Sequence, residues 1–177
     1  MFLYLENSPQ VGDSVKNVEQ TMELLAILNM YLINEENVVS NGQELVKFFQ
    51  KCAQEAACVF TTKKANRLLV LEGNIGVGKT TTLNRLVSEH SKEEIVAGPL
   101  DIWHRIIVIN PQAVNNNIFE EFYQTLAVES ETIVVFIFQI IALYSRLTYL
   151  VHCYQHTPET SVLISERSFL SDRYKVP

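Results

Sequence analysis

One eight-residue run, Gly73 to Thr80, constrains the fold of this chain more than any other feature. It reads Gly-Asn-Ile-Gly-Val-Gly-Lys-Thr and matches the pattern G-x-x-x-x-G-K-T. An apolar run at 68–71 precedes it and predicts a short buried strand, while 81–90 predicts the helix that follows. A strand, a glycine-rich turn and a helix are the context that a phosphate-binding P-loop requires. The sequence therefore predicts a P-loop.

The residue types of this run suit phosphate binding. Glycines let the backbone approach phosphate oxygens closely, and backbone N–H groups at the start of a helix attract anions. Lys79 would reach the β- and γ-phosphates, and the Thr80 hydroxyl would hold Mg²⁺. The alternative is an ordinary glycine turn before a helix, which the flanking strand disfavours. The predicted nucleotide-binding residues are Gly73, Asn74, Ile75, Gly76, Val77, Gly78, Lys79, Thr80 and Thr81.

The charge of the chain narrows the classes of partner, and its cysteines narrow the type of compartment. The net charge is −6, and no basic patch is available to follow a nucleic-acid backbone, so DNA and RNA polymers are not expected partners. The hydrophobic content of 47% and charged content of 19% are those of a globular protein with a core. Cys52, Cys58 and Cys153 match no zinc spacing or disulfide framework and are typical of a reducing compartment.

No targeting segment is evident in the sequence. The apolar start lacks a basic region and meets Glu6 at once, and no arginine precedes Arg67, so neither a secretory signal nor a mitochondrial presequence is predicted. The longest apolar stretch, Ile133 to Tyr144, is interrupted by Gln139 and is too short to span a bilayer. It predicts a buried helix and no membrane partner. We expect a cytoplasmic protein, with mitochondrial and nuclear locations left open.

Two helices are predicted ahead of the P-loop, over 14–33 and about 43–59. Residues 61–66 are polar and form the best domain boundary. We therefore predict an acidic helical extension over 1–66. It could pack on its own domain or serve as a partner-binding or oligomerising face, so a homodimer stays open. The second helix places these apolar residues on one face: Leu45, Phe48, Phe49, Cys52 and Ala56.

The remainder, 67–177, alternates strands with helices. Strands are predicted at 68–72, around 94–97 and at 162–164, separated by helices at 80–90, 118–128 and 132–152 and by an Asn-rich loop at 115–117. Such alternation implies an α/β domain with a parallel sheet, whose ligands bind at the carboxyl ends of the strands.

Glu166 and Arg167 directly follow the last predicted strand. An acidic residue there can hold Mg²⁺ or its water shell, and an arginine can neutralise phosphoryl charge as it develops. The alternative is a solvated loop end. Their place after a buried strand, downstream of a P-loop, favours the functional interpretation.

Three segments in this order resemble the deoxynucleoside kinases: Leu71–Thr81, Phe136–Leu147 and Glu166–Tyr174. The most similar branch is deoxycytidine and deoxyguanosine kinase, and the resemblance covers about 68–176. It implies a three-layer P-loop fold with strand order 2-3-1-4-5. It also implies transfer of the γ-phosphoryl group of ATP, with Mg²⁺, to the 5′-hydroxyl of a deoxynucleoside. In that reaction Lys79, Glu166 and Arg167 would be the catalytic residues, and Thr80 and Glu166 the metal ligands.

The same resemblance assigns the nucleoside site. Gln139 would pair its amide with the base edge, while Arg146 and Asp172 would form a charged pair beside the base. Trp103 would line the pocket, and Tyr123 would contact the sugar. Each has a plainer interpretation, since single aromatic residues usually belong to a core and an amide on an apolar helix can face solvent. A buried amide needs a partner, which supports the role of Gln139.

One position departs from the family pattern. The family carries a Glu-Pro-Val-x-x-Trp segment whose glutamate is the general base for the 5′-hydroxyl. This chain reads Gly98-Pro99-Leu100-Asp101-Ile102-Trp103, so glycine occupies the position of the base. A general base contributes about 10²–10⁴-fold to the rate. Asp101 is the nearest carboxylate in the sequence.

The sequence ends at Pro177, ahead of the arginine-rich lid and the last two strands of the family. The expectation is an incomplete domain whose first strand lies at an apolar edge that is prone to association. The function expected is that of a deoxynucleoside kinase. The alternative is a non-catalytic nucleotide-binding pseudokinase, an accessory subunit, or a truncated gene product of the same fold.

His152 and His156 are four residues apart on a predicted helix. That spacing could hold a metal ion, but a capping or surface role is favoured because the helix ends close by, before Pro158. No function is assigned to this pair.

Overall fold

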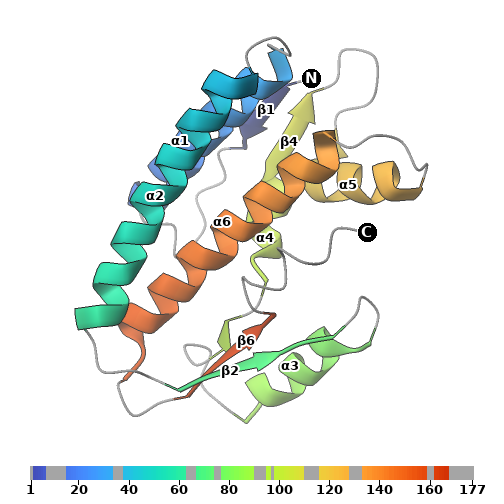
Figure 1. The fold of residues 1–177 in the computed structure, drawn as a ribbon. Coiled ribbons are helices and arrows are strands. Elements are labelled where there is room, and N and C mark those ends of the chain that lie inside the picture. The colour runs from blue at the N-terminus through green and yellow to red at the C-terminus, as the bar shows by residue number, and fades with distance from the viewer. Residues whose placement is uncertain are drawn as a thin grey trace. The chain divides into compact units, whose positions relative to one another are not determined.

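The computed structural model describes residues 2–6, 15–33, 38–62, 67–73, 77–89, 95–96, 98–109, 116–127, 133–158 and 162–167. Figure 1 shows its helices and strands. The chain packs into two compact units. The first combines Met1–Ala53 with Leu100–Ala142, and the second combines Gln54–Pro99 with Leu143–Pro177. These units group residues by packing and do not test the predicted division after residue 66.

The second unit is built on a parallel sheet. Strands β2 (Arg67–Leu71), β6 (Val162–Glu166) and β3 (Ile95–Val96) pair in the order β2-β6-β3. Ile164 pairs with Leu69 on one side and Ile95 on the other. The three predicted strands are present, and their order agrees with the expected 2-3-1. The predicted burial of the first strand is wrong, because β2 pairs with β6 alone among the described strands and its residues are exposed except for the half-buried Leu71. Helix α3 (Lys79–Val87) lies alongside β2 and β6 (Figure 1).

The core of this unit lies beside β6. Side chains alternate along this strand, so that Leu163 is fully buried while its neighbours are half-buried. Leu163 packs in one cluster with residues of α6 (Ile133–His156) and with Val96 of β3, and the Phe60 ring of α2 (Val38–Thr62) meets the Tyr154 ring edge-on at 4.8 Å. The cluster comprises Val96, Leu150, Cys153, Tyr154 and Leu163, with Val59 and Phe60 packed against it. It anchors the strand that ends in Glu166.

The first unit contains an antiparallel sheet that the sequence did not predict. Strand β4 (Ile106–Ile109) lies between β1 (Phe2–Leu5) and β5 (Asn116–Asn117). The register pairs Leu3 with Val108, and both side chains are buried. Four-residue apolar runs carry little periodicity, and β1 and β4 are about a hundred residues apart, so no local signal joins them. The expected Asn-rich loop is in part strand β5.

Both predicted helices of the N-terminal segment are confirmed. They are α1 (Val15–Ile33) and α2, which extends beyond the predicted 43–59 at both ends and includes the first two residues of the predicted connector. Figure 1 shows α1 beside α2, and Lys51 of α2 forms a 3.1 Å ion pair with Glu23 of α1. Four residues of the predicted apolar face are buried and Phe49 is half-buried; the four are Leu45, Phe48, Cys52 and Ala56.

Three helices complete the described chain. The short α4 (Leu100–Arg105) was not predicted, whereas α5 (Ile118–Ala127) and α6 confirm the predicted helices. Among the described residues, α6 alone has the length and composition of a membrane span, with a mean hydropathy of 1.8 over its best 18 residues. The prediction that this segment is too short to span a membrane is therefore wrong, because the helix continues past Tyr144 to His156. Of those 18 residues 44% are buried within the protein, and buried core helices pass the same test.

Candidate functional site

The glycine-rich turn leads into α3 as predicted. Gly78 precedes the helix with φ +82°, in the left-handed region, and a Cβ added there would meet no atom within 4 Å. Glycine is therefore favoured here by the backbone conformation and not by lack of space. Thr82 closes the first turn, because its N–H and hydroxyl both donate to the Gly78 carbonyl. Residues 74–76, three of the predicted nucleotide-binding residues, lie outside the described residues.

Lys79 folds back over the turn. Its side chain is buried, and Nζ donates to the Gly73 carbonyl at 2.9 Å. Gly73 is closely covered, since a Cβ at this position would approach Cγ2 of Val77 to 2.8 Å. The ammonium is thus held within the turn, where a P-loop lysine must be to reach phosphates.

Thr80 and Glu166 meet although they are 86 residues apart in the sequence. The Thr80 hydroxyl donates to Oε1 of Glu166 at 3.4 Å. Thr80 belongs to the first turn of α3, and Glu166 is the last residue of β6, whose partner β2 leads into the glycine turn. A hydroxyl and a carboxylate are hard oxygen ligands of the kind that Mg²⁺ prefers. These two residues fit the predicted metal site.

Arg167 follows with an unusual backbone. Its φ is +66°, the left-handed region that residues with a Cβ seldom adopt. Its N–H donates to the carbonyl of Leu71, at the end of β2, at 3.1 Å. The structure therefore brings four predicted residues to one edge of the parallel sheet: Lys79, Thr80, Glu166 and Arg167. This edge is formed by the carboxyl ends of the strands, where ligands of parallel sheets bind.

In the first unit, two predicted nucleoside residues join one aromatic cluster. Trp103 of α4 is 3% exposed, with its ring centroid 5.9 Å from that of Phe119 and 5.3 Å from that of Phe138. Tyr123 is partly exposed and meets Phe119 edge-on at 4.9 Å. Gln139, next to Phe138, is half-buried. Aromatic rings of this kind can stack on a base, although Trp103 and Phe138 are buried and Tyr123 is the exposed member.

Sequence reasoning named neither Phe119 nor Phe122 as part of this cluster. Phe122 stacks on Phe138 with ring centroids 4.3 Å apart, and Phe119 links Trp103 to Tyr123. The four-residue spacing from Phe119 to Tyr123 on a predicted helix was the available signal.

The remaining predicted residues are less fully placed. Arg146 is half-buried on α6 and belongs to the second unit, while its predicted partner Asp172 lies outside the described residues, so their pairing stays a prediction. Gly98 is half-buried and followed by the buried Pro99. Asp101, in the first turn of α4, is exposed.

Two titratable groups near the end of α6 depart from their usual behaviour. Burial and the neighbouring His156 lower the pKa of His152, and the two rings lie 4.2 Å apart. His156 donates from Nδ1 to the His152 carbonyl, which agrees with the expected capping role. Burial raises the pKa of the Cys153 thiol to about 11, which disfavours the thiolate that a nucleophilic cysteine needs. Among the described residues no group of three or more metal-ligating side chains occurs.

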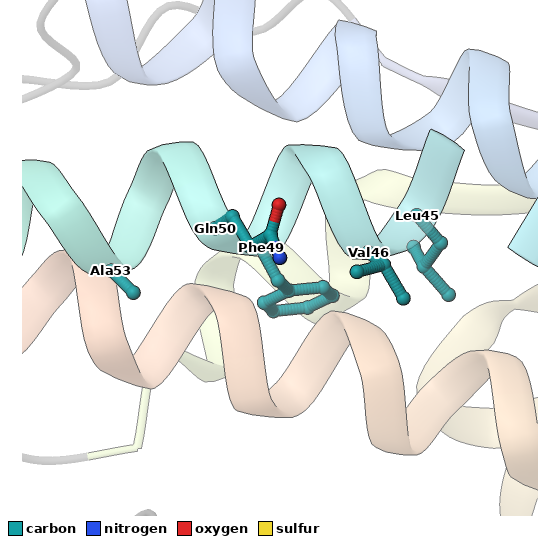
Figure 2. Close-up of a pocket in the computed structure, with 5 residues that line it drawn as sticks. All are labelled: Leu45, Val46, Phe49, Gln50 and Ala53. Carbon is teal, nitrogen blue, oxygen red and sulfur yellow. The ribbon is translucent and has the colours of Figure 1, made fainter. Parts of the chain in front are cut away.

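A separate apolar pocket of about 360 Å³ lies on α2. Figure 2 shows its lining residues, all of which come from this helix. They are Leu45, Val46, Phe49, Gln50 and Ala53. None is a predicted site residue, and the pocket lacks the charged groups that a phosphate ligand requires.

Comparison with known proteins adds one positive finding. The family model described as deoxynucleoside kinase matches residues 69–175, which is more than half of the chain. No solved structure matches the chain significantly. The matched segment begins within β2 and includes the glycine turn, α3, the aromatic cluster, α6 and β6.

Proposed function

Because this chain belongs to the deoxynucleoside kinase family, we propose that it transfers the γ-phosphoryl group of ATP to the 5′-hydroxyl of a deoxynucleoside. One observation carries the proposal, the 3.4 Å contact between the hydroxyl of Thr80 and the carboxylate of Glu166. It joins the first turn of α3 to the end of β6, which is the arrangement that a metal-bound triphosphate needs at a P-loop.

Each of the residues proposed to contact the phosphates has its own role in this proposal. Lys79 would exchange the Gly73 carbonyl for phosphate oxygens, since its ammonium is already held in the turn. Thr80 and Glu166 would hold Mg²⁺, which supplies charge neutralisation at the phosphates when bound. Arg167 would neutralise the negative charge that develops on the transferred group. These tasks are those of phosphoryl transfer, in which positioning and electrostatics provide most of the catalysis.

The nucleoside would bind to the aromatic cluster. In this proposal the side chain of Trp103 lines the pocket, Tyr123 contacts the sugar, and Gln139 pairs with the base. Arg146 and Asp172 would form the charged pair that accepts cytosine or a purine, as the resemblance to deoxycytidine and deoxyguanosine kinases implies. The half-buried position of Gln139, directly after the buried Phe138 in the sequence, supports this assignment, because an amide that is withdrawn from water needs a polar partner.

The phosphate half of the proposal is tested by nucleotide binding. We expect the purified protein to bind ATP with Mg²⁺ in calorimetry, and Lys79→Ala to weaken that binding at least about tenfold, because a charged hydrogen-bonding partner of the phosphates is lost. Lys47→Ala is the matched control, since Lys47 is an exposed lysine paired with Glu44 on α2. Equal ATP affinity in the wild type and Lys79→Ala would refute the assignment.

A second candidate function is nucleotide binding without efficient turnover, as in a pseudokinase or an accessory subunit. Gly98 favours it, because glycine stands where the resembling kinases have their general base and the nearby Asp101 is exposed. Under this proposal the wild type turns over deoxycytidine or deoxyguanosine poorly. Gly98→Glu would then raise the rate by up to the factor of about 10²–10⁴ that such a base typically contributes. Robust wild-type turnover, measured by release of labelled monophosphate, would exclude this candidate.

A further inference from the structure

The turn after β6 contains a backbone conformation that needs support. Arg167 has φ +66°, and it is the only residue other than glycine with a positive φ among those the structure describes. In the left-handed conformation the Cβ of an L-residue crowds the backbone, so such a residue relaxes unless its surroundings hold it. In the proposed function, Arg167 is also the residue that neutralises the negative charge on the transferred phosphoryl group.

Two hydrogen bonds hold this turn. The N–H of Arg167 donates to the carbonyl of Leu71, and the carbonyl of Arg167 accepts a hydrogen bond from the hydroxyl of Ser165 at 3.0 Å. The first bond fixes the turn to the end of β2. The second fixes it to its own strand, so both polar backbone groups of Arg167 have a partner.

Ser165 is an unexpected residue at its position. Along β6 the side chains of Leu163 and Ser165 point to the same buried face, and Ser165 is only 7% exposed. An apolar side chain would fill such a place without cost, whereas a buried hydroxyl is unfavourable unless it is hydrogen-bonded. The only hydrogen bond that we observe for this hydroxyl among the described residues is that to Arg167.

We propose that Ser165 is a positioning residue for nucleotide binding, because its hydroxyl holds Arg167 in the left-handed turn and so directs the arginine side chain towards the phosphates. The direction in which a side chain leaves the backbone depends on φ and ψ, so relaxation of this turn would redirect the guanidinium group. Glu166, between the two residues, would keep its contact with Thr80, so the loss would concern the arginine. The proposal rests on the proposed function, in which Arg167 meets phosphate.

Removal of the hydroxyl tests this proposal. We expect Ser165→Ala to weaken ATP binding about three- to tenfold, the effect of losing one hydrogen bond that orders a charged ligand contact. Ser165→Thr, which keeps a hydroxyl, should retain most of the affinity. Ser145→Ala is the matched control, since Ser145 is a buried serine of α6 in the same unit. Its ATP affinity should equal that of the wild type at temperatures where both are folded.

A double-mutant cycle separates positioning from general stability. If Ser165 acts through Arg167, then Ser165→Ala combined with Arg167→Gln should bind ATP no more weakly than Arg167→Gln alone. Additive losses would overturn the proposal, as would an unchanged ATP affinity in either single variant. Lys79→Ala, measured in parallel, distinguishes a failure of the positioning role from a failure of the proposed function. If only Lys79→Ala weakens binding, the positioning role fails and the proposed function stands; if Lys79→Ala has no effect either, the proposed function fails.

Discussion

A single amide provides the sharpest test of base recognition. Gln139 is half-buried on α6 and directly follows Phe138 of the aromatic cluster in the sequence. We expect Gln139→Leu to weaken deoxynucleoside binding at least about tenfold, because a base edge would lose its hydrogen-bonding partner, while ATP binding stays unchanged. Gln155→Leu, an exposed glutamine of the same helix, is the control. Calorimetric titration with deoxycytidine and with ATP measures both effects, and joint loss of the two affinities would indicate misfolding instead of recognition.

The histidine pair makes stability depend on pH. Burial, and secondarily His156, lowers the pKa of His152, so the folded protein binds fewer protons at this group than the unfolded chain does. The stabilisation is complete above the ordinary histidine pKa of about 6.5 and is lost as the pH falls through the lowered value. We therefore expect the urea midpoint to fall on acidification below about pH 6.5, and to fall less in His152→Asn. A pH dependence that is the same in both proteins would contradict this assignment.

At the scale of elements, α1 holds the first strand in place. The carboxamide of the buried Asn29 accepts a hydrogen bond from the N–H of Leu3 at 2.7 Å and donates one to the Leu3 carbonyl at 2.8 Å. It thereby acts as a partner for the backbone of β1 on the side away from β4. Asn29→Leu should lower the free energy of unfolding by about 2–4 kcal/mol, because two buried backbone groups lose their partner. Urea denaturation measures this, with the exposed Asn84→Leu as control. A loss below about 0.5 kcal/mol would contradict it.

The elements that the sequence predicted are those with strong local signals. The place of α3 followed from the glycine-rich turn, whereas the order of the parallel strands followed from the resemblance to the deoxynucleoside kinases. The strands β1 and β4 lacked any such signal, because their pairing joins distant segments and depends on Asn29, a residue that looks like an ordinary polar position of a helix. Burial of α6 was predicted from composition, and so was most of its length, since the helix ends at His156 and the prediction was 132–152.

The same contrast holds for the candidate site. Lys79, Thr80 and Glu166 were identified from motifs, and the structure places them together. The left-handed turn at Arg167 and the support from Ser165 could not be predicted, because arginine gives no sign of a positive φ and serine is common after apolar residues. Conformational constraints of this kind arise only when a strand and its neighbour have been paired.

At the scale of the whole molecule, we expect the open side of β2 in the parallel sheet to influence association. Among the described residues β2 pairs with β6 alone, and three of its apolar side chains are exposed. They are Leu68 at 42%, Leu69 at 58% and Val70 at 37%. Apolar strands at an open edge are templates for pairing with further chains.

We expect Leu69→Lys to reduce association of the purified protein, because a charged side chain on an edge strand opposes strand pairing. Light scattering over a concentration series measures the effect. Leu100→Lys, which adds the same charge at an exposed leucine of α4, should leave association unchanged. A wild-type protein that stays monomeric throughout the series would show that this edge is not adhesive.

The hydrogen bond from Lys79 to Gly73 has a consequence for ligand selection. If the turn binds phosphate as proposed, the carbonyl of Gly73 competes with any anion for the ammonium of Lys79. Under the proposed function a ligand would share or compete for the ammonium with the carbonyl of Gly73, and a single phosphate or sulfate offers few oxygens for that purpose. A triphosphate offers several oxygens to the same backbone and so overcomes the competitor. Under the proposed function, this internal hydrogen bond would therefore favour long phosphate chains over simple anions.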